Sequence, residues 1–122
     1  MTAPDPKRDA WWLGVRAETW VADRLVEDGW LVLARNWRTE AGEIDLVAER
    51  DGVLRFVEVK ARAAGDASAI EAVGERKQGV LRRAADLWLD TRGRPSREAA
   101  FLVVLVEEGP DGWSAEWIDD AF

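Results

Sequence analysis

The chain has 122 residues, of which 48% are hydrophobic and 34% charged, which is typical of a globular domain rather than of a disordered protein. It contains no cysteine and no histidine, which excludes disulfides, imidazole metal ligands and histidine-based triads, and leaves oxygen ligands for any metal. The net charge of −7 argues against a strongly basic nucleic-acid-binding surface, but six acids and no bases fall in 101–122, so much of the excess lies in one terminal segment.

Two regions of the sequence bear on its organisation. Residues 1–9 contain Pro4 and Pro6 and show no apolar periodicity, so we expect a flexible tail followed by a single domain over 10–122. No apolar run approaches the roughly 20 residues of a membrane span, and no signal-peptide core follows the first residues. We therefore expect a cytoplasmic protein with no membrane association.

The hydrophobic pattern predicts helices and strands along the whole domain. The first helix ends at Gly29 and carries Glu18 on the edge of its apolar stripe. The predicted elements are a helix at 10–28, a strand at 30–37, two hairpin strands within 42–60, a helix at 70–91, a strand at 99–106 and a short strand at 113–118. A small-residue segment at 62–68 is a candidate mobile flap. The order αβββαβ with a short last strand predicts an α/β (α+β) fold, with a mixed sheet of four to five strands flanked by helices.

The turn Asp51-Gly52 sets the expected register of the hairpin. Asp-Gly between two β-rich runs indicates a type I′ turn, which needs positive φ at both central residues, so Arg50 is expected to face Val53. Counting back along the strands places two pairs opposite each other on one face of the sheet: Asp45 with Glu58, and Glu43 with Lys60.

Opposed carboxylates are unfavourable unless a cation lies between them. Two carboxylates about 5 Å apart repel by about 3 kcal/mol at an effective dielectric constant of about 20. A divalent cation would reverse this, and Mg²⁺ prefers carboxylate oxygens and water as ligands. The pair Asp45 and Glu58 therefore predicts a metal site, with Lys60 on the same face to stabilise negative charge or orient a water molecule. The alternatives are a solvated acidic face and a simple ion pair between Lys60 and Glu43.

Asp45, followed by Glu58-Val59-Lys60, resembles the active-site signature of the PD-(D/E)XK nuclease superfamily. The wider sequence is similar to the YraN-like family of predicted bacterial endonucleases. The matching segments are Gly14 to Glu18, Leu33 to Arg38, Gly42 to Leu46, Phe56 to Lys60, Lys77-Gln78, Ala84-Ala85 and Asp119 to Phe122. The resemblance implies a restriction-endonuclease-like core that uses Mg²⁺ or Mn²⁺ to hydrolyse phosphodiester bonds in structured DNA, such as branches or flaps.

The resemblance also implies roles for residues outside the hairpin. Glu18 matches a first-helix glutamate that completes the metal site in the superfamily. Lys77 and Gln78 on the second helix could contact phosphates, although a solvated helix face explains them equally well.

Two arginines beside the hairpin are further nucleic-acid-binding candidates. Arg35 and Arg38 flank Asn36-Trp37, and basic residues interleaved with an aromatic side chain can bind single-stranded nucleic acid. We favour the alternative that Trp37 belongs to the core, because most tryptophans of a small domain are buried.

A catalytically silent module with the same fold is the main rival function. It would bind nucleic acid or a protein partner, and the acidic composition favours it, as does the absence of the aspartate that the family usually has at the start of the late strand. The sequence leaves the oligomeric state open.

Overall fold

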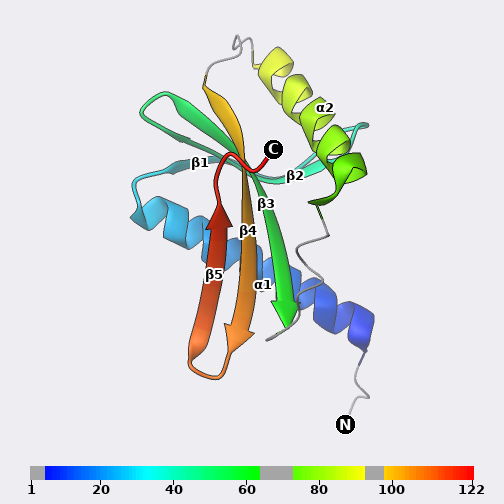
Figure 1. The fold of residues 1–122 in the computed structure, drawn as a ribbon, viewed down its shortest axis with the longest axis vertical. Helices are drawn as coiled ribbons and strands as arrows, with labels where there is room; N and C mark the ends of the chain where they lie inside the picture. The colour runs from blue at the N-terminus through cyan, green and yellow to red at the C-terminus, as the bar shows by residue number, and fades with distance from the viewer. Residues whose placement is uncertain (1–4, 64–72, 93–97) are drawn as a thin grey trace.

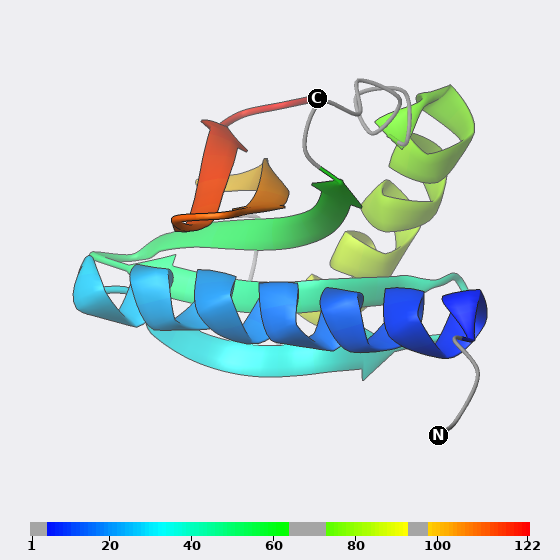
Figure 2. The ribbon, with the colours of Figure 1, turned by 90° about the horizontal axis from the view of Figure 1, so that it is seen from below.

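The computed structural model describes residues 5–63, 73–92 and 98–122. These residues form an α+β fold with one mixed five-stranded sheet in the order β1-β2-β3-β4-β5 and one helix on each side (Figures 1 and 2). The elements are α1 (Pro6–Glu27), β1 (Leu31–Arg38), β2 (Glu43–Arg50), β3 (Val53–Ala63), α2 (Glu75–Thr91), β4 (Ala99–Gly109) and β5 (Gly112–Ile118). The predicted fold class is confirmed.

Helix α1 begins earlier than the sequence pattern predicts. The expected flexible tail over residues 1–9 is wrong for 6–9, which are helical, while residues 1–4 lie outside the described residues. The Asp5 side chain accepts hydrogen bonds from the backbone N–H groups of Lys7 and Arg8, and Pro6 has the φ that a first helical position requires. The capping residues therefore start the helix before any apolar periodicity appears.

The β2–β3 hairpin has the predicted turn, and it has the predicted register from Arg50 and Val53 as far as Leu46 and Val57, but the predicted pairing of Glu43 opposite Lys60 is not formed. Asp51 and Gly52 have φ values of 52° and 80°, and Arg50 lies opposite Val53. The backbone pairing of β2 with β3 ends at Leu46 opposite Val57. Beyond this point β2 stays paired with β1 and β3 continues in parallel with β4, so the two hairpin strands part.

Each face of the sheet packs against one helix. On one face, Ala17, Val21, Ala22 and Leu25 of α1 pack against β2, β3 and β4. On the other face, Ala84, Ala85 and Trp88 of α2 pack against β1, β2 and β3. Trp37 packs edge-on against Trp88 with ring centroids 5.4 Å apart. The interpretation of Trp37 as a core residue is therefore confirmed.

A tight turn positions the start of β2. The Thr39 hydroxyl accepts hydrogen bonds from the backbone N–H groups of Ala41 and Gly42, both at 3.0 Å. Gly42 packs so closely against α2 that a Cβ would collide with the Val80 side chain. A side chain at residue 42 would push α2 away from the turn that leads into Glu43 and Asp45.

The other boundaries differ from the sequence expectation by a few residues. Helix α2 is described from Glu75, and the expected start at 70 falls outside the described residues, as does most of the candidate flap at 62–68. Strand β4 extends to Gly109, three residues beyond the predicted end, because Glu107, Glu108 and Gly109 pair with β5. Neither helix in the described parts of the chain has the length and apolar character to cross a bilayer.

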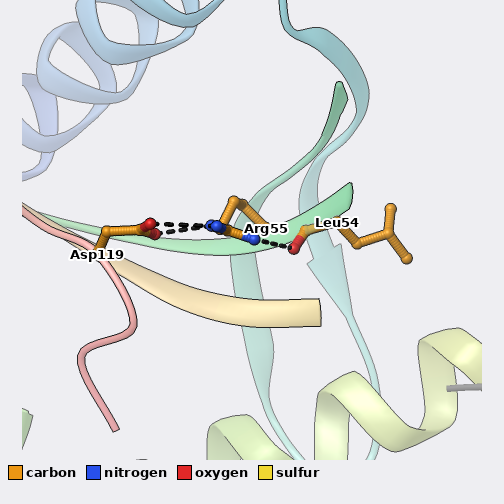
Figure 3. Close-up of polar contacts among 3 residues, drawn as sticks. All are labelled: Leu54, Arg55 and Asp119. Carbon is orange, nitrogen blue, oxygen red and sulfur yellow. Dashed lines mark hydrogen bonds and ion pairs between the residues drawn. The ribbon is translucent and has the colours of Figure 1, made fainter. Parts of the chain in front are cut away.

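A bidentate ion pair ties the end of β5 back to β3. Figure 3 shows Arg55 between Asp119 and the Leu54 carbonyl. The Arg55 guanidinium donates to the Asp119 carboxylate at 2.7 and 3.1 Å and to the Leu54 carbonyl oxygen at 3.0 Å. These hydrogen bonds hold the pKa of Asp119 below its ordinary value of 3.8. The contact spans β4, which lies between β3 and β5 in the sheet.

We expect Asp119→Asn to lower the free energy of unfolding by about 0.5–1 kcal/mol at neutral pH, the scale of a well-formed exposed ion pair. The folded-state pKa of Asp119 is lowered, so this stabilisation is present above pH 3.8 and is lost as the pH falls below that value. Urea denaturation of both proteins at neutral and acidic pH measures it. Asp111→Asn, in the exposed β4–β5 turn, is the matched control. A loss that is the same at both pH values would contradict this role.

Candidate metal centre

The acidic residues singled out by the sequence gather where β2 and β3 part. Asp45 lies one residue beyond the last paired residue of β2, and Glu58 lies one residue beyond its partner on β3. The Asp45 carboxylate accepts a hydrogen bond from the Val59 backbone N–H at 2.8 Å. The two carboxyl groups are close enough for the charge of Asp45 to raise the pKa of Glu58. The gap between the strands is thus bridged by side chains instead of by the backbone ladder.

Glu58 has one satisfied and one unsatisfied oxygen. Its side chain is only 12% exposed, and Oε1 lies 3.3 Å from Nζ of Lys77 on α2. Oε2 is buried without a conventional donor. A buried carboxylate oxygen without a donor is costly, so this atom requires either a shared proton or a cation.

Glu18 reaches the same cluster from α1. With its amide nitrogen turned toward the acids, Asn36 of β1 donates to Glu18 Oε2 at 2.9 Å and to Glu43 Oε1 at 3.1 Å. Asp45 is close enough for its charge to raise the pKa of Glu18. Asn36 adopts a φ of 48°, which asparagine tolerates better than most residues. Asn36 therefore holds two acids beside Asp45.

Burial and mutual repulsion raise the pKa values of the three central acids. Burial is the largest cause for each. The pKa of Glu58 rises from its ordinary value of 4.5 to about 7, and the charge of Asp45 adds to the effect of burial. The pKa of Glu18 also rises to about 7, with Asp45 and then Glu43 as the neighbouring charges. The pKa of Asp45 is raised as well, although the Val59 N–H and the Lys77 ammonium oppose the shift. At neutral pH the cluster therefore retains protons that a cation could replace.

A cleft of about 570 Å³ opens onto one side of these acids. It is lined by Ala10, Trp11, Gly14, Val15, Glu18, Asn36, Arg38, Glu43 and Asp45. A bound molecule in this cleft would contact both α1 and the parting end of β2. Glu18, Glu43 and Asp45 are therefore accessible from solvent on this side, whereas Glu58 does not line the cleft.

The donor set suits a hard divalent cation. Asp45 and Glu58 are carboxylates on adjacent strands, and the unsatisfied Glu58 oxygen could be a ligand to Mg²⁺ or Mn²⁺. Among residues 5–63, 73–92 and 98–122, no three acidic side chains are already arranged as a complete ligand set. Glu18 is hydrogen-bonded to Asn36 and Glu58 is paired with Lys77, so cation binding would require these acids to exchange partners.

Lys60 does not form the ion pair with Glu43 that was the alternative to a role in the reaction. Glu43 instead lies 3.7 Å from the Arg38 guanidinium and accepts from Asn36, because β2 follows β1 after leaving β3. Lys60 is exposed, two residues beyond Glu58, and strand alternation places it on the same face of the sheet as Glu58. Its position leaves the ammonium group open to a substrate.

The candidate nucleic-acid contacts fall into two groups. Arg38 lines the cleft and is 83% exposed, while Arg35 is exposed on the edge strand β1 and does not line the cleft. On α2, Lys77 pairs with Glu58, and the Gln78 amide donates to the Val73 carbonyl oxygen at 3.0 Å, so Gln78 has a local structural bond.

Asn36 is the residue of the cluster that the sequence reasoning missed. Strands are depleted in asparagine, so an asparagine within a run typical of a strand is unusual. This is the one sequence feature that could have pointed to Asn36. No feature of the sequence indicated that Lys77 pairs with Glu58. The two residues are nineteen positions apart, on a helix and a strand that meet only in the folded protein.

Comparisons with known proteins agree with the sequence resemblance. Residues 17–106 match the family described as "Uncharacterised protein family UPF0102". A UPF0102 protein of Gloeobacter violaceus is 50% identical over 101 residues, which is 80% of each chain. A UPF0102 protein of Agrobacterium fabrum is 44% identical over 100 residues, covering 80% of this chain and 81% of the relative. A third, from Symbiobacterium thermophilum, is 44% identical over 101 residues, covering 82% and 86%.

We expect the metal-free protein to lose stability as the pH rises from about 4.5 to about 7, because the pKa of Glu58 is raised over this range and ionisation then opposes folding. Glu58→Gln should remove part of this slope and raise the free energy of unfolding near pH 7 by on the order of 2 kcal/mol. Urea denaturation in chelator across this range measures it. Glu40→Gln, on the exposed β1–β2 turn, should leave the slope unchanged. An equal slope in the Glu58 variant and the wild type would mean that Glu58 does not carry the effect.

Proposed function

Because this chain belongs to the UPF0102 (YraN-like) family, a member of the PD-(D/E)XK nuclease-like superfamily, we propose that it is a divalent-metal-dependent nuclease. Its proposed substrate is structured DNA with branches or flaps, cleaved by hydrolysis of a phosphodiester bond in the cytoplasm. The relatives are named only by family, so the proposal depends on the chemistry of the site.

The observation that carries the proposal is the buried, unsatisfied oxygen of Glu58 beside Asp45. A purely structural acid would be expected to have donors for both oxygens, since an unpaired buried carboxylate oxygen destabilises the fold. Mg²⁺ or Mn²⁺ bound by Asp45 and Glu58, with Glu18 as a third ligand, would give this oxygen a partner. The raised pKa values are consistent with a site that exchanges protons for a cation.

Each side chain of the site has a distinct task in this proposal. When bound, the cation would supply a water molecule of lowered pKa and stabilise negative charge on the phosphate. Asp45, oriented by the Val59 N–H, and Glu58, oriented by Lys77, hold their carboxylates toward the gap between β2 and β3. Lys60 offers its ammonium group to the charge that develops on the phosphate oxygens. Glu18, the third ligand in this proposal, would give up its proton when the cation binds, because its pKa is raised to about 7 in the metal-free protein.

Cleavage assays on defined substrates test the proposal. Labelled duplex, single-stranded, flap and four-way DNA are incubated with wild-type protein in Mg²⁺, in Mn²⁺ and in chelator. We expect metal-dependent products from at least one branched or flap substrate, and Asp45→Asn should abolish them. Cleavage in chelator, or by the Asp45 variant, would contradict the proposal.

We expect Lys60→Ala to reduce the cleavage rate by about 100-fold, the usual scale for loss of a charge-stabilising or acid–base group. Calorimetric titration with Mn²⁺ should show unchanged or tighter metal binding, because both carboxylates are still present. Glu58→Gln should lose metal binding and cleavage together. Arg83→Ala, on the exposed side of α2, is the control for a lost surface charge. If Lys60→Ala cleaves at the wild-type rate, Lys60 has no part in the reaction.

The pairing of Lys77 with Glu58 favours a second candidate function, a silent binding module. In that case Lys77 would be the permanent counterion of Glu58, in place of a metal, and the fold would serve only to bind nucleic acid or a protein. The two functions differ in what Mg²⁺ does to the protein.

We expect Lys77→Gln to lower stability in chelator by about 1 kcal/mol, because Glu58 loses its counterion. Mg²⁺ should then raise the melting temperature of Lys77→Gln more than that of the wild type, since ligand binding to the folded state stabilises it. Thermal melts with and without Mg²⁺ measure this, and Arg76→Gln is the matched control one residue away. If Mg²⁺ shifts neither melting temperature, the silent module becomes the better explanation.

A further inference from the structure

Two exposed tryptophans lie at one end of the acidic cleft. Trp11 and Trp12 of α1 are 60% and 48% exposed, and their ring centroids lie 4.7 Å apart at an interplanar angle of 70°. Trp11 also lines the cleft that contains Glu18 and Asp45. An indole presents a large apolar surface, so two adjacent exposed indoles beside a cleft mark an interaction site.

The first half of α1 leads from these rings into the acids. Lys7, Trp11, Gly14 and Glu18 are spaced i, i+4, i+7 and i+11, which places them on one stripe of the helix. Trp11, Gly14 and Glu18 all line the cleft, and Lys7 is exposed at the start of the stripe. A molecule lying along this stripe would therefore meet a cation, an indole, an open surface and then the carboxylates.

Gly14 is the part of the stripe that packing does not explain. Glycine in a helix interior is unfavourable relative to alanine. A Cβ at this position would meet no atom within 4 Å, so no neighbouring element requires a glycine here. Because the open space above Gly14 belongs to the cleft, its missing side chain is best explained by a bound molecule that approaches the helix backbone.

The chemistry of the stripe fits an unpaired nucleotide. Exposed indole faces stack with nucleobases of any sequence. Lys7, at the start of the stripe, and the 83%-exposed Arg38 in the cleft, which also lies beside Glu43, supply positive charge for phosphates. Bases inside a duplex are already stacked and cannot lie against a protein ring. We propose that Trp11 and Trp12 bind unpaired bases beside the acidic centre, so that the substrate is nucleic acid with a single-stranded segment next to the cleaved bond.

A second copy of this chain is the other occupant that two exposed indoles could accept. Asp5 and Asp9 lie beside Lys7 and Arg8, so the charge at this end of α1 is balanced and does not oppose a symmetric dimer. The oligomeric state of the wild type and of Trp11→Ala is therefore measured together with binding.

The part of the inference that concerns cleavage rests on the proposed nuclease function, whereas base binding does not, so binding is measured in chelator. Fluorescence anisotropy compares a labelled oligothymidine, the same oligomer with abasic sites, and a blunt duplex. We expect the oligothymidine to bind most tightly, and Trp11→Ala to weaken its binding about 5- to 100-fold while leaving the abasic oligomer unaffected. Trp11→Phe should restore most of the affinity, because phenylalanine also stacks.

One further variant is a control, and a second tests the role of Gly14. Trp117→Ala removes a 41%-exposed tryptophan that lines a different cavity, and it should not change binding. Gly14→Ala should raise the melting temperature yet weaken oligothymidine binding, a combination that a purely structural glycine would not produce. The proposal is overturned if Trp11→Ala weakens the abasic oligomer equally, if the duplex binds as tightly as the single strand, or if Trp11→Ala changes only the oligomeric state. Base binding without cleavage of any substrate would overturn the nuclease function alone.

Discussion

The confinement of Asp45 and Glu58 to the gap between β2 and β3 is the constraint on which the rest of the site depends. Two hydrogen-bonded strands would normally close this gap, but the ladder ends at Leu46 and Val57. The two carboxylates then meet in a poorly hydrated space, where burial and repulsion disfavour their charges. A proton, the Lys77 ammonium and a divalent cation are the available means of relieving this strain.

The surrounding elements can be understood as supports for this unfavourable pair. Helix α1 contributes Glu18 and α2 contributes Lys77, so the centre lies where both faces of the sheet supply side chains. The hydrophobic contacts of the helices hold these side chains in place, and Gly42 allows α2 to approach the start of β2. Fully packed cores on both faces supply the stability that the acids reduce, as is common at functional sites.

The acidic composition and a nucleic-acid substrate are compatible because charge is distributed unevenly. Acidic side chains converge on the centre itself, where a cation would offset them, while Arg38 lines the cleft and Lys7 lies on the same stripe of α1 as Trp11. With few basic residues, stacking on Trp11 would carry much of the binding. Binding that depends more on stacking than on charge would favour substrates that already expose unpaired bases over intact duplex.

The sequence by itself determined the element order, the type I′ turn at Asp51-Gly52 and therefore the phase that brings Asp45 and Glu58 together, because turn geometry and the two-residue period of a strand are local properties. Capping by Asp5 was also local, but it was hidden by the absence of apolar periodicity. Only the tertiary structure decided that β2 and β3 separate after Leu46 and Val57. Because of this separation, Glu43 contacts Arg38 and Asn36 instead of Lys60. The tertiary structure also decided that Lys77 neutralises Glu58 and that the Trp11 stripe borders the acids. These contacts join segments that are far apart in the chain. They depend on how the two helices pack on opposite faces of the sheet, which the spacing of residues in the sequence does not reveal.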